Sequence, residues 1–531
     1  MSTPAASGGA AVWLLAAGQT LIYAGVYYAF PALLPDLQAA TGWTVAELAL
    51  GPTLAARVAF TAASADGWFR NRLPSHPDLD STREYAMRTT LLWQPSTAAS
   101  VTLQLATSVQ DGTNYGSYSV PGALGTGAGV YEAYGAGSSY FRTGLAPRQI
   151  EAEFTPRRRA STWSAALKGA FDLGHGLALN TVTAWDKGKL FVPEDTDGSP
   201  RKALEIPYTD RGTQFSQDIR LTISWSGPVN IILGGYFHRE ALFNSTVMNF
   251  WTDLDVDGNG RVDSADCAAN TSLLACVIGN RFDQLKHSYA LYGDLRWCIA
   301  ARTTLRGGLR FTRDDGAQTG MTSDLRGVDG VLVSTPIAPT DRFFVNRNLS
   351  GKIGIDHKFD DGTLLFASYS RGYRGSGFNA QAYFNVAEVN VAKPEMLDAF
   401  EGGLKMRNAD RSLSLSATGF TYAYRNQQFL SVNPANAEQT LVNLDASRIY
   451  GGELELQLRL DPRLLVGLAL VLASALGVSA LVASNNKSEQ VYVTTQALAV
   501  GHVLESTDVR PASLALGTVS AGYVTASLFV L

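Results

Sequence analysis

The sequence predicts a mainly β chain folded as a transmembrane antiparallel β-barrel. Apolar and polar residues alternate along many short segments, as where Ile219, Leu221, Ile223 and Trp225 are interleaved with polar residues. Tight turns join such segments at one end, and long connections join them at the other. The mean hydropathy is zero although 46% of the residues are hydrophobic. These three features are typical of barrels that cross an outer membrane with alternating strands.

Composition restricts the class of partner. The 531 residues carry a formal net charge of -4, which argues against a nucleic-acid partner, because such a partner needs a basic face. Charged residues make up 17% of the chain, below the typical value of about a quarter. Aromatic residues number 53, from 9 Trp, 21 Tyr and 23 Phe, and there are 51 glycines. A barrel in contact with membrane lipid has this kind of composition.

Residues 56–463 contain fourteen candidate strands, which predict about 14 strands of a barrel. They are 56–68, 84–95, 99–110, 162–174, 177–188, 214–226, 229–241, 285–298, 302–314, 345–359, 363–373, 395–406, 412–424 and 448–460. Residues 227–228, 360–362 and 408–410 predict tight turns. The longer connections are 111–161, 189–213, 242–284, 315–344 and 425–447. A soluble β-sandwich is the alternative, but it would have to carry these connections as lids or disorder.

An acidic segment in the connection 242–284 predicts a calcium site. Calcium is a hard cation that takes about six to eight oxygen ligands, and a twelve-residue loop supplies them from positions 1, 3, 5, 7, 9 and 12. The residues at these positions are Asp255, Asp257, Asn259, Arg261 (through its carbonyl), Asp263 and Asp266, with Gly260 at the turn. Position 12 is Asp rather than Glu, which resembles the dockerin variant of the loop. A solvated acidic loop is the alternative.

Two cysteines follow this acidic segment. Cys267 and Cys276 lie nine residues apart and could form a disulfide in an oxidising compartment, where it would staple the same loop. Cys298 is left over on a predicted strand. Three free thiols are the alternative.

Both ends of the chain predict apolar helices rather than strands. Residues 10–34 are uncharged and long enough to span a bilayer, and no Lys or Arg precedes Arg57, unlike in a cleaved signal peptide. Residues 464–484 are uncharged and rich in Leu, Ala and Val, and they give the strongest transmembrane-helix pattern of the chain. The alternative for the N-terminal end is a stray hydrophobic anchor. The alternative for the C-terminal end is an ordinary anchor followed by a small β tail.

Each end also resembles an inner-membrane family. The string GVYYAFPALLPDLQAATGWTVAELALGPTLA resembles the start of a major facilitator superfamily transporter, which makes 1–55 a fragment of such a protein. Residues 485–531, with Gly501-His-Val-Leu and Thr507-Asp508, resemble a truncated SAF-type β-clip domain of membrane-anchored pilus-assembly proteins. The inner membrane is therefore an alternative location.

The central region resembles the barrel of TonB-dependent outer-membrane receptors. The resemblance is carried by the order and spacing of several strings: DGWFRNR (66–72), QFSQDIRLT (214–222), LRFTRDD (309–315), NLSGKIGIDHKFDDGTLLFASYSRGYRGSGFN (348–379) and KPEMLDAFEGGLK (393–405). It implies a 22-stranded barrel filled by an N-terminal plug. It also implies uptake of an iron-siderophore or similar small nutrient, an outer-membrane location with lipid contact, and a TonB-type energiser.

Departures from the family pattern limit these expectations. About 14 of 22 strands are predicted, and neither the plug nor the segment that contacts TonB is found in 1–55. The abrupt changes near Ala55 and Arg463 suggest a composite chain of a barrel, 56–463, a helix, 464–484, and the two flanking fragments. We therefore expect the chain as written not to transport efficiently.

The resemblance also implies ligand contacts on the long connection 111–161, because loop aromatics and arginines contact the imported ligand in the family. The candidate residues are Tyr115, Tyr118, Tyr131, Tyr134, Tyr140 and Arg142. Tyrosines of the membrane-interface girdle or of loop packing are the alternative.

The sequence predicts no enzyme activity. The six histidines show no metal-ligand spacing, and neither a Gly-x-Ser-x-Gly elbow nor a P-loop occurs. Besides the receptor barrel, two other functions stay open: an inner-membrane-anchored protein with a periplasmic β domain, and a calcium-dependent surface-binding module.

Overall fold

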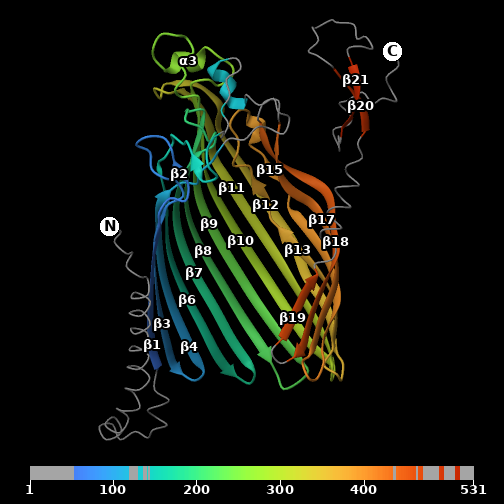
Figure 1. Cartoon of the computed structure of the whole chain (residues 1–531). Helices are drawn as coiled ribbons and strands as arrows, with labels where there is room; N and C mark the ends of the chain where they lie inside the picture. The colour runs from blue at the N-terminus through green and yellow to red at the C-terminus, as the bar shows by residue number, and fades with distance from the viewer. Residues whose placement is uncertain are drawn as a thin grey trace, which may run out of the picture. The chain divides into compact units, whose positions relative to one another are not determined.

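The computed structural model describes residues 53–118, 129–135, 140, 144–433, 438–461, 464–470, 489–494 and 509–514 (Figure 1). The predicted N-terminal helix, 10–34, lies outside the described residues. Arg142 also lies outside them, as do most residues beyond 470.

One antiparallel sheet dominates the described residues and contains fifteen strands. Their order is β1(Thr53–Ala65), β3(Thr82–Ser96), β4(Ala99–Thr113), β6(Arg157–Gly174), β7(Leu177–Asp195), β8(Leu204–Ser224), β9(Val229–Phe250), β10(Cys276–Ala300), β11(Thr303–Gly327), β12(Leu332–Lys358), β13(Leu364–Arg374), β16(Glu395–Arg407), β17(Leu413–Val432), β18(Gln439–Asp461) and β19(Leu464–Leu470). We call these fifteen strands the wall strands. Each lies beside the wall strand that precedes it in the sequence, as expected when short turns join antiparallel neighbours.

Smaller elements lie along the chain between the strands of the large sheet or, for the last two of them, after its last strand. Three two-stranded sheets pair β2(Arg70–Asn71) with β5(Gln149–Ile150), β14(Gly377–Phe378) with β15(Val391–Ala392), and β20(Glu489–Thr494) with β21(Val509–Leu514). The helical turns are η1(Gly129–Tyr134), α3(Ser264–Ala268) and η2(Val386–Glu388). None of the described helices is both long and apolar enough to cross a membrane.

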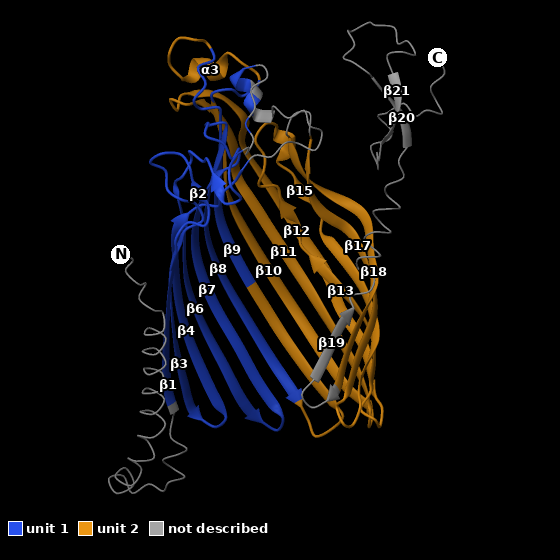
Figure 2. Cartoon of the chain, viewed as in Figure 1, with its two compact units in different colours: residues 1–223, 238–256, 272–275 blue, residues 224–237, 257–271, 276–531 orange. Residues whose placement is uncertain are grey.

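The chain divides into two compact units, coloured in Figure 2. The first comprises 1–223, 238–256 and 272–275, and its small core packs Leu79, Ile150 and Ala152 against Phe69. The second comprises 224–237, 257–271 and 276–531, and its core gathers Phe282, Met321, Ile337, Ala382 and Val389. Both cores involve residues of the long connections and strand ends, whereas many large apolar residues of the wall strands are exposed. Such an exposed apolar surface agrees with the predicted contact with lipid.

All fourteen predicted strands are confirmed, but several are longer than predicted. The segments predicted as 285–298, 302–314 and 345–359 are the 25-, 25- and 27-residue strands β10, β11 and β12. The predicted connection 315–344 is therefore mostly strand, and β11 and β12 stay paired through four register shifts along it. Beyond the apolar band both faces of a strand are polar, so the alternation disappears from the sequence while backbone pairing continues.

The helix predicted over 464–484 is wrong for its first seven residues. They form strand β19, which pairs with β18 through Leu454↔Leu470 and the pairs that follow. Without this pairing β18 would leave a row of backbone N–H and C=O groups open, which is costly in lipid. Residues 471–484 lie outside the described residues.

Candidate functional site

Three of the predicted ligand tyrosines lie together in the first unit. Tyr131 and Tyr134, on η1, have ring centroids 5.2 Å apart, and Tyr140 stacks on Tyr131 at 5.6 Å. We call these three residues the tyrosine cluster. Tyr115 and Tyr118, the other two described candidates, are exposed. The Arg158 guanidinium carbon lies 4.8 Å from the centre of the Tyr115 ring.

Charged residues hold the tyrosine cluster in place. The Tyr134 hydroxyl donates to Asp253 Oδ1 at 2.7 Å, and Arg201 Nε lies 2.8 Å from Asp253 Oδ2. The Arg201 guanidinium carbon lies 4.0 Å above the Tyr134 ring, a cation–π contact. The Tyr140 hydroxyl donates to Glu151 Oε2 at 2.6 Å.

Tyr134 and Tyr140 remain neutral phenols. Burial, together with the hydrogen bond to Asp253, raises the pKa of Tyr134 far above its ordinary range. Burial and the hydrogen bond to Glu151 do the same to the pKa of Tyr140. The cluster therefore offers ring faces and, beside them, the Arg201 guanidinium, whereas the hydrogens of both phenols are already donated to Asp253 and Glu151. Ring faces and a guanidinium group suit an aromatic or anionic small molecule.

A group of four carboxyl groups lies in the same unit, at the ends of β7 and β8. Asp195, Asp197 and Glu205 are almost fully buried, and each has one buried side-chain oxygen without a hydrogen-bond partner among the described residues. Glu153 has two such oxygens. We call Glu153, Asp195, Asp197 and Glu205 the acid cluster.

Burial is the main cause of the raised pKa values in the acid cluster. The pKa values of Glu153 and Asp195 rise to about 9, and that of Glu205 to about 7. The pKa of Asp197 is also raised by burial. Backbone N–H groups of Gly198 and Leu204 donate to Asp195 and Asp197 at 3.0 and 2.6 Å. Protonated carboxyl groups avoid the cost of burying several like charges.

Gly198 lets this region pack against the predicted ligand loop. Its φ is +59°, a left-handed conformation that favours glycine, and a Cβ atom there would lie 2.7 Å from the backbone of Tyr118. The turn after β7 can therefore lie directly against the segment that follows β4.

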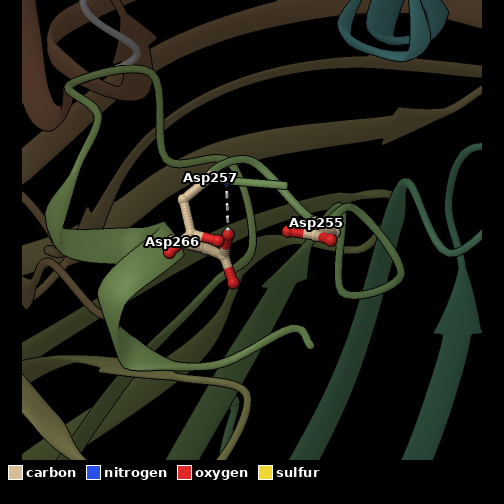
Figure 3. Close-up of side chains that lie close together, drawn as sticks. All are labelled: Asp255, Asp257 and Asp266. Atoms are coloured by element: carbon tan, nitrogen blue, oxygen red, sulfur yellow. Dashed lines mark hydrogen bonds between the residues drawn. The ribbon is translucent and has the colours of Figure 1, made fainter. Parts of the chain in front are cut away.

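The residues predicted to bind calcium are partly brought together. Carboxylate oxygens of Asp255, Asp257 and Asp266 lie within 4.8 Å of one another (Figure 3). Asp266 is fully buried and accepts the backbone N–H of Asp257 at 3.0 Å and of Asp263 at 2.8 Å. Figure 3 marks the first of these bonds.

Two other predicted ligands have local structural roles. Asp263 is the N-cap of α3, with Asp266 at the third helical position, so the two form a capping box. The Asn259 side-chain oxygen accepts the backbone N–H of Arg261 at 2.9 Å. Cys267 and Cys276, immediately beyond the capping box, form a disulfide with an Sγ–Sγ distance of 2.06 Å, and Cys298 is free and exposed.

Comparison with known proteins identifies the family to which the chain belongs. The family model described as TonB dependent receptor-like, beta-barrel matches residues 93–502, more than three quarters of the chain. The chain belongs to this family. The match continues to residue 502, beyond the point where the sequence suggested that the barrel ends.

Solved TonB-dependent receptors have a similar fold. The ferric yersiniabactin uptake receptor of Yersinia pestis is 17% identical, with a TM-score of 0.56 over 77% of this chain and 54% of that one. The siderophore receptor of Acinetobacter baumannii is 15% identical, with a TM-score of 0.54, and the match covers 78% of this chain and 58% of that one. A copper transporter is 15% identical, with a TM-score of 0.53, and the match covers 77% of this chain and 55% of that one. The chain thus spans between half and three fifths of the length of these proteins.

Membership of the TonB-dependent receptor family decides between the alternatives left by the sequence. The family consists of outer-membrane receptors and transporters rather than enzymes, so the chain is an outer-membrane barrel protein. An inner-membrane protein with a periplasmic β domain is not favoured.

Sequence reasoning missed the acid cluster and the roles of Arg201 and Asp253. These residues come from three connections, and their contacts depend on how the strand ends fold together. One pattern was available: 194–197 contains three carboxylates within four residues, at the C-terminal end of β7.

Proposed function

We propose that this TonB-dependent receptor barrel serves the uptake of a ferric siderophore or a similar small metal chelate, driven by a TonB-type energiser. The observation that supports this proposal is the tyrosine cluster with Arg201 held between Tyr134 and Asp253. Siderophores combine flat, polar chelating groups with negative charge. Ring faces suit the flat groups, and a guanidinium group, which has five N–H donors, suits the negative charge.

Ligand binding to the purified full chain tests this proposal. A panel of ferric catecholate, hydroxamate and carboxylate chelates is titrated while intrinsic fluorescence is followed. Because Tyr134 provides a ring face and holds Arg201 through the cation–π contact, Tyr134→Ala should weaken binding of the preferred chelate about tenfold, and Arg201→Ala should have an effect of the same order. Tyr85→Ala, on the exposed surface of β3, is the matched control. Unchanged affinity in both loop variants would sink the proposed contact site.

We also propose that residues 255–266 bind calcium and thereby order the loop. All donors of the set are oxygens, and three carboxylates already converge, which suits a hard cation of this size. Asp266 is the least accessible donor, because both of its oxygens already accept backbone N–H groups. Calcium would take over part of that role by binding Asp266 together with Asp255 and Asp257.

Hydrogen exchange with and without calcium checks this proposal. Adding calcium to the chelator-treated chain should slow amide exchange over 255–276, and Asp257→Ala should abolish the slowing. Glu84→Gln, an exposed carboxylate on β3 outside the set, should leave it intact. Slowing of the same size in wild type and Asp257→Ala would mean that calcium acts elsewhere.

A further inference from the structure

Strands β12, β13, β16, β17 and β18 of the second unit present one continuous apolar face. Residues directly opposite each other in an antiparallel pair point to the same face. One row of opposite residues is His357, Leu365, Leu404, Ala417 and Leu454. The neighbours of these residues along the strands, such as Lys405 and Glu453, point to the other face. Because the chain is an outer-membrane barrel, the apolar face is the one that lipid covers.

A groove crosses this apolar face. Its floor is the next row towards the long connections, where Ala367 is opposite Gly402 and Gly402 is opposite Gly419. Neither glycine has a side chain to fill the surface. The groove has a volume of about 610 Å³ and an almost wholly apolar lining. Its walls include Leu305, Ile353, Ile355, Tyr369, Phe400 and Thr421.

Aromatic residues border the groove on the side of the long connections. Tyr369 is opposite Phe400, with ring centroids 4.7 Å apart, and Thr421 in the same row is opposite Tyr450. Aromatic rings gather where the lipid-facing surface of a barrel meets the headgroups. The next row therefore lies at the depth of the lipid headgroups.

That next row is basic. Arg371 is opposite Asp398, Asp398 is opposite Ala423, and Ala423 is opposite Arg448. Arg425 lies two residues beyond Ala423 on β17 and therefore shares the face. We call Arg371, Arg425 and Arg448 the arginine row.

One carboxylate does not neutralise the arginine row. Asp398 Oδ1 accepts from Arg371 Nε at 2.7 Å and from the Tyr369 hydroxyl at 2.6 Å, and Arg425 also contacts Asp398. Arg448 is exposed and makes no ion pair with any described residue. Three guanidinium groups against one carboxylate leave a net charge of +2 at the edge of the groove.

We propose that the groove and the arginine row together bind a phosphorylated anionic lipid of the surrounding membrane. One acyl chain would lie in the groove, and the phosphate would lie against Arg448 and Arg425. Acyl chains surround the whole barrel, so an apolar groove alone gives little preference for one lipid. The preference comes from charge complementarity, because guanidinium groups bind phosphate through paired hydrogen bonds. The proposal rests on the outer-membrane location of the family and not on chelate uptake.

Lipid titration of the purified full chain in a neutral detergent tests this site. Bound dimyristoyl phosphatidylglycerol and bound dimyristoyl phosphatidylcholine are counted by native mass spectrometry. Phosphatidylglycerol should bind at one site about tenfold more tightly than phosphatidylcholine. Arg448→Ala should remove most of this preference, and Arg459→Ala, an equal loss of charge on the opposite face of β18, should keep it.

A second variant tests the groove separately from the charge. Only one atom, the Gly402 carbonyl oxygen, would approach a Cβ atom at Gly419, and it would lie 4.0 Å away, so Gly419→Leu adds an apolar side chain to the floor of the groove without a clash at Cβ. This variant should weaken binding of both lipids several-fold. Gly235→Leu, on β9 outside the groove, should not. Equal binding of the two lipids by wild type, or equal effects of Arg448→Ala and Arg459→Ala, would overturn the proposal, as would unchanged lipid binding in Gly419→Leu.

Discussion

At the scale of the residue, the buried carboxyl groups of this protein are of two kinds. In one kind both oxygens accept hydrogen bonds, and in the other one oxygen has no described partner. Asp266 is fully buried, but both of its oxygens accept backbone N–H groups, so its burial is compensated. Asp195 and Glu205 each keep one buried oxygen without a described partner, so burial acts on their protonation instead. Stability near β7 and β8 should therefore depend on pH.

The first prediction concerns the acid cluster, which lies at strand ends outside the membrane-spanning part. A carboxyl group with a raised folded-state pKa contributes stability that is complete below its unfolded pKa, near 4, and is lost as pH rises through the folded pKa. With pKa values of about 7 for Glu205 and about 9 for Glu153 and Asp195, the loss should run from roughly pH 4 to pH 9. Local opening at 195–205 should then increase at least about tenfold.

Hydrogen exchange of 195–205, corrected for the intrinsic pH dependence of exchange, measures this loss. Glu205→Gln should flatten the lower part of the profile, because the amide does not titrate. Asp329→Asn, at an exposed carboxylate, serves as control. A profile in wild type as flat as in the Gln variant would show that burial does not control these groups.

At the scale of the element, the sequence predicted where strands exist better than where they end. The alternation in 218–225 located β8 because one side of each strand meets lipid and the other does not. Near Glu205 and throughout 315–344 neither side meets lipid, so nothing in the residue pattern marks the continued pairing. The prediction of a helix over 464–470 was wrong for the opposite reason. An entirely apolar run fits a buried helix and an edge strand equally well, and the backbone partner on β18 decided the outcome.

The candidate sites were also predicted only in part. Residues close together in the chain were found, and residues from separate connections were not. The twelve-residue spacing found the carboxylates of Asp255, Asp257 and Asp266 because they are local in the chain. The tyrosines of one connection were also found. Their partners Arg201 and Asp253 come from other connections, and only the fold brings them to Tyr134.

The disulfide gives the second prediction. Cys267 and Cys276 close a short loop from α3 to the first residue of β10. Replacing both by Ser should cost about 2–3 kcal/mol of local stability, the value expected for a loop of this length. Protease cleavage within 257–275 should become faster in the double variant while the wall strands stay resistant. Cys298→Ser, at the free thiol, should change neither, and equal cleavage in all three proteins would contradict the prediction.

At the scale of the whole molecule, outer-membrane location leads to the third prediction. Paired strands leave few open backbone groups in lipid, so a folded wall should resist detergent until it is boiled. The full chain should appear in the outer-membrane fraction, and its electrophoretic mobility should differ between unheated and boiled samples. Proline in place of Phe400, in the middle of β16, should abolish this difference by removing a ladder hydrogen bond. Recovery of the chain with one mobility only would contradict a folded wall.

The length of β10, β11 and β12 has a consequence for how such a receptor can change its ligand. About ten residues of a strand suffice to cross a bilayer, whereas these strands have 25 to 27. More than half of each strand therefore continues beyond the length needed to cross the bilayer, and β11 and β12 remain paired there. Side chains on a ladder can be exchanged one at a time without moving the backbone. Under the proposed uptake function, a ligand that contacts the ladder would meet a fixed frame, so single substitutions there would change specificity at little cost in conformational entropy.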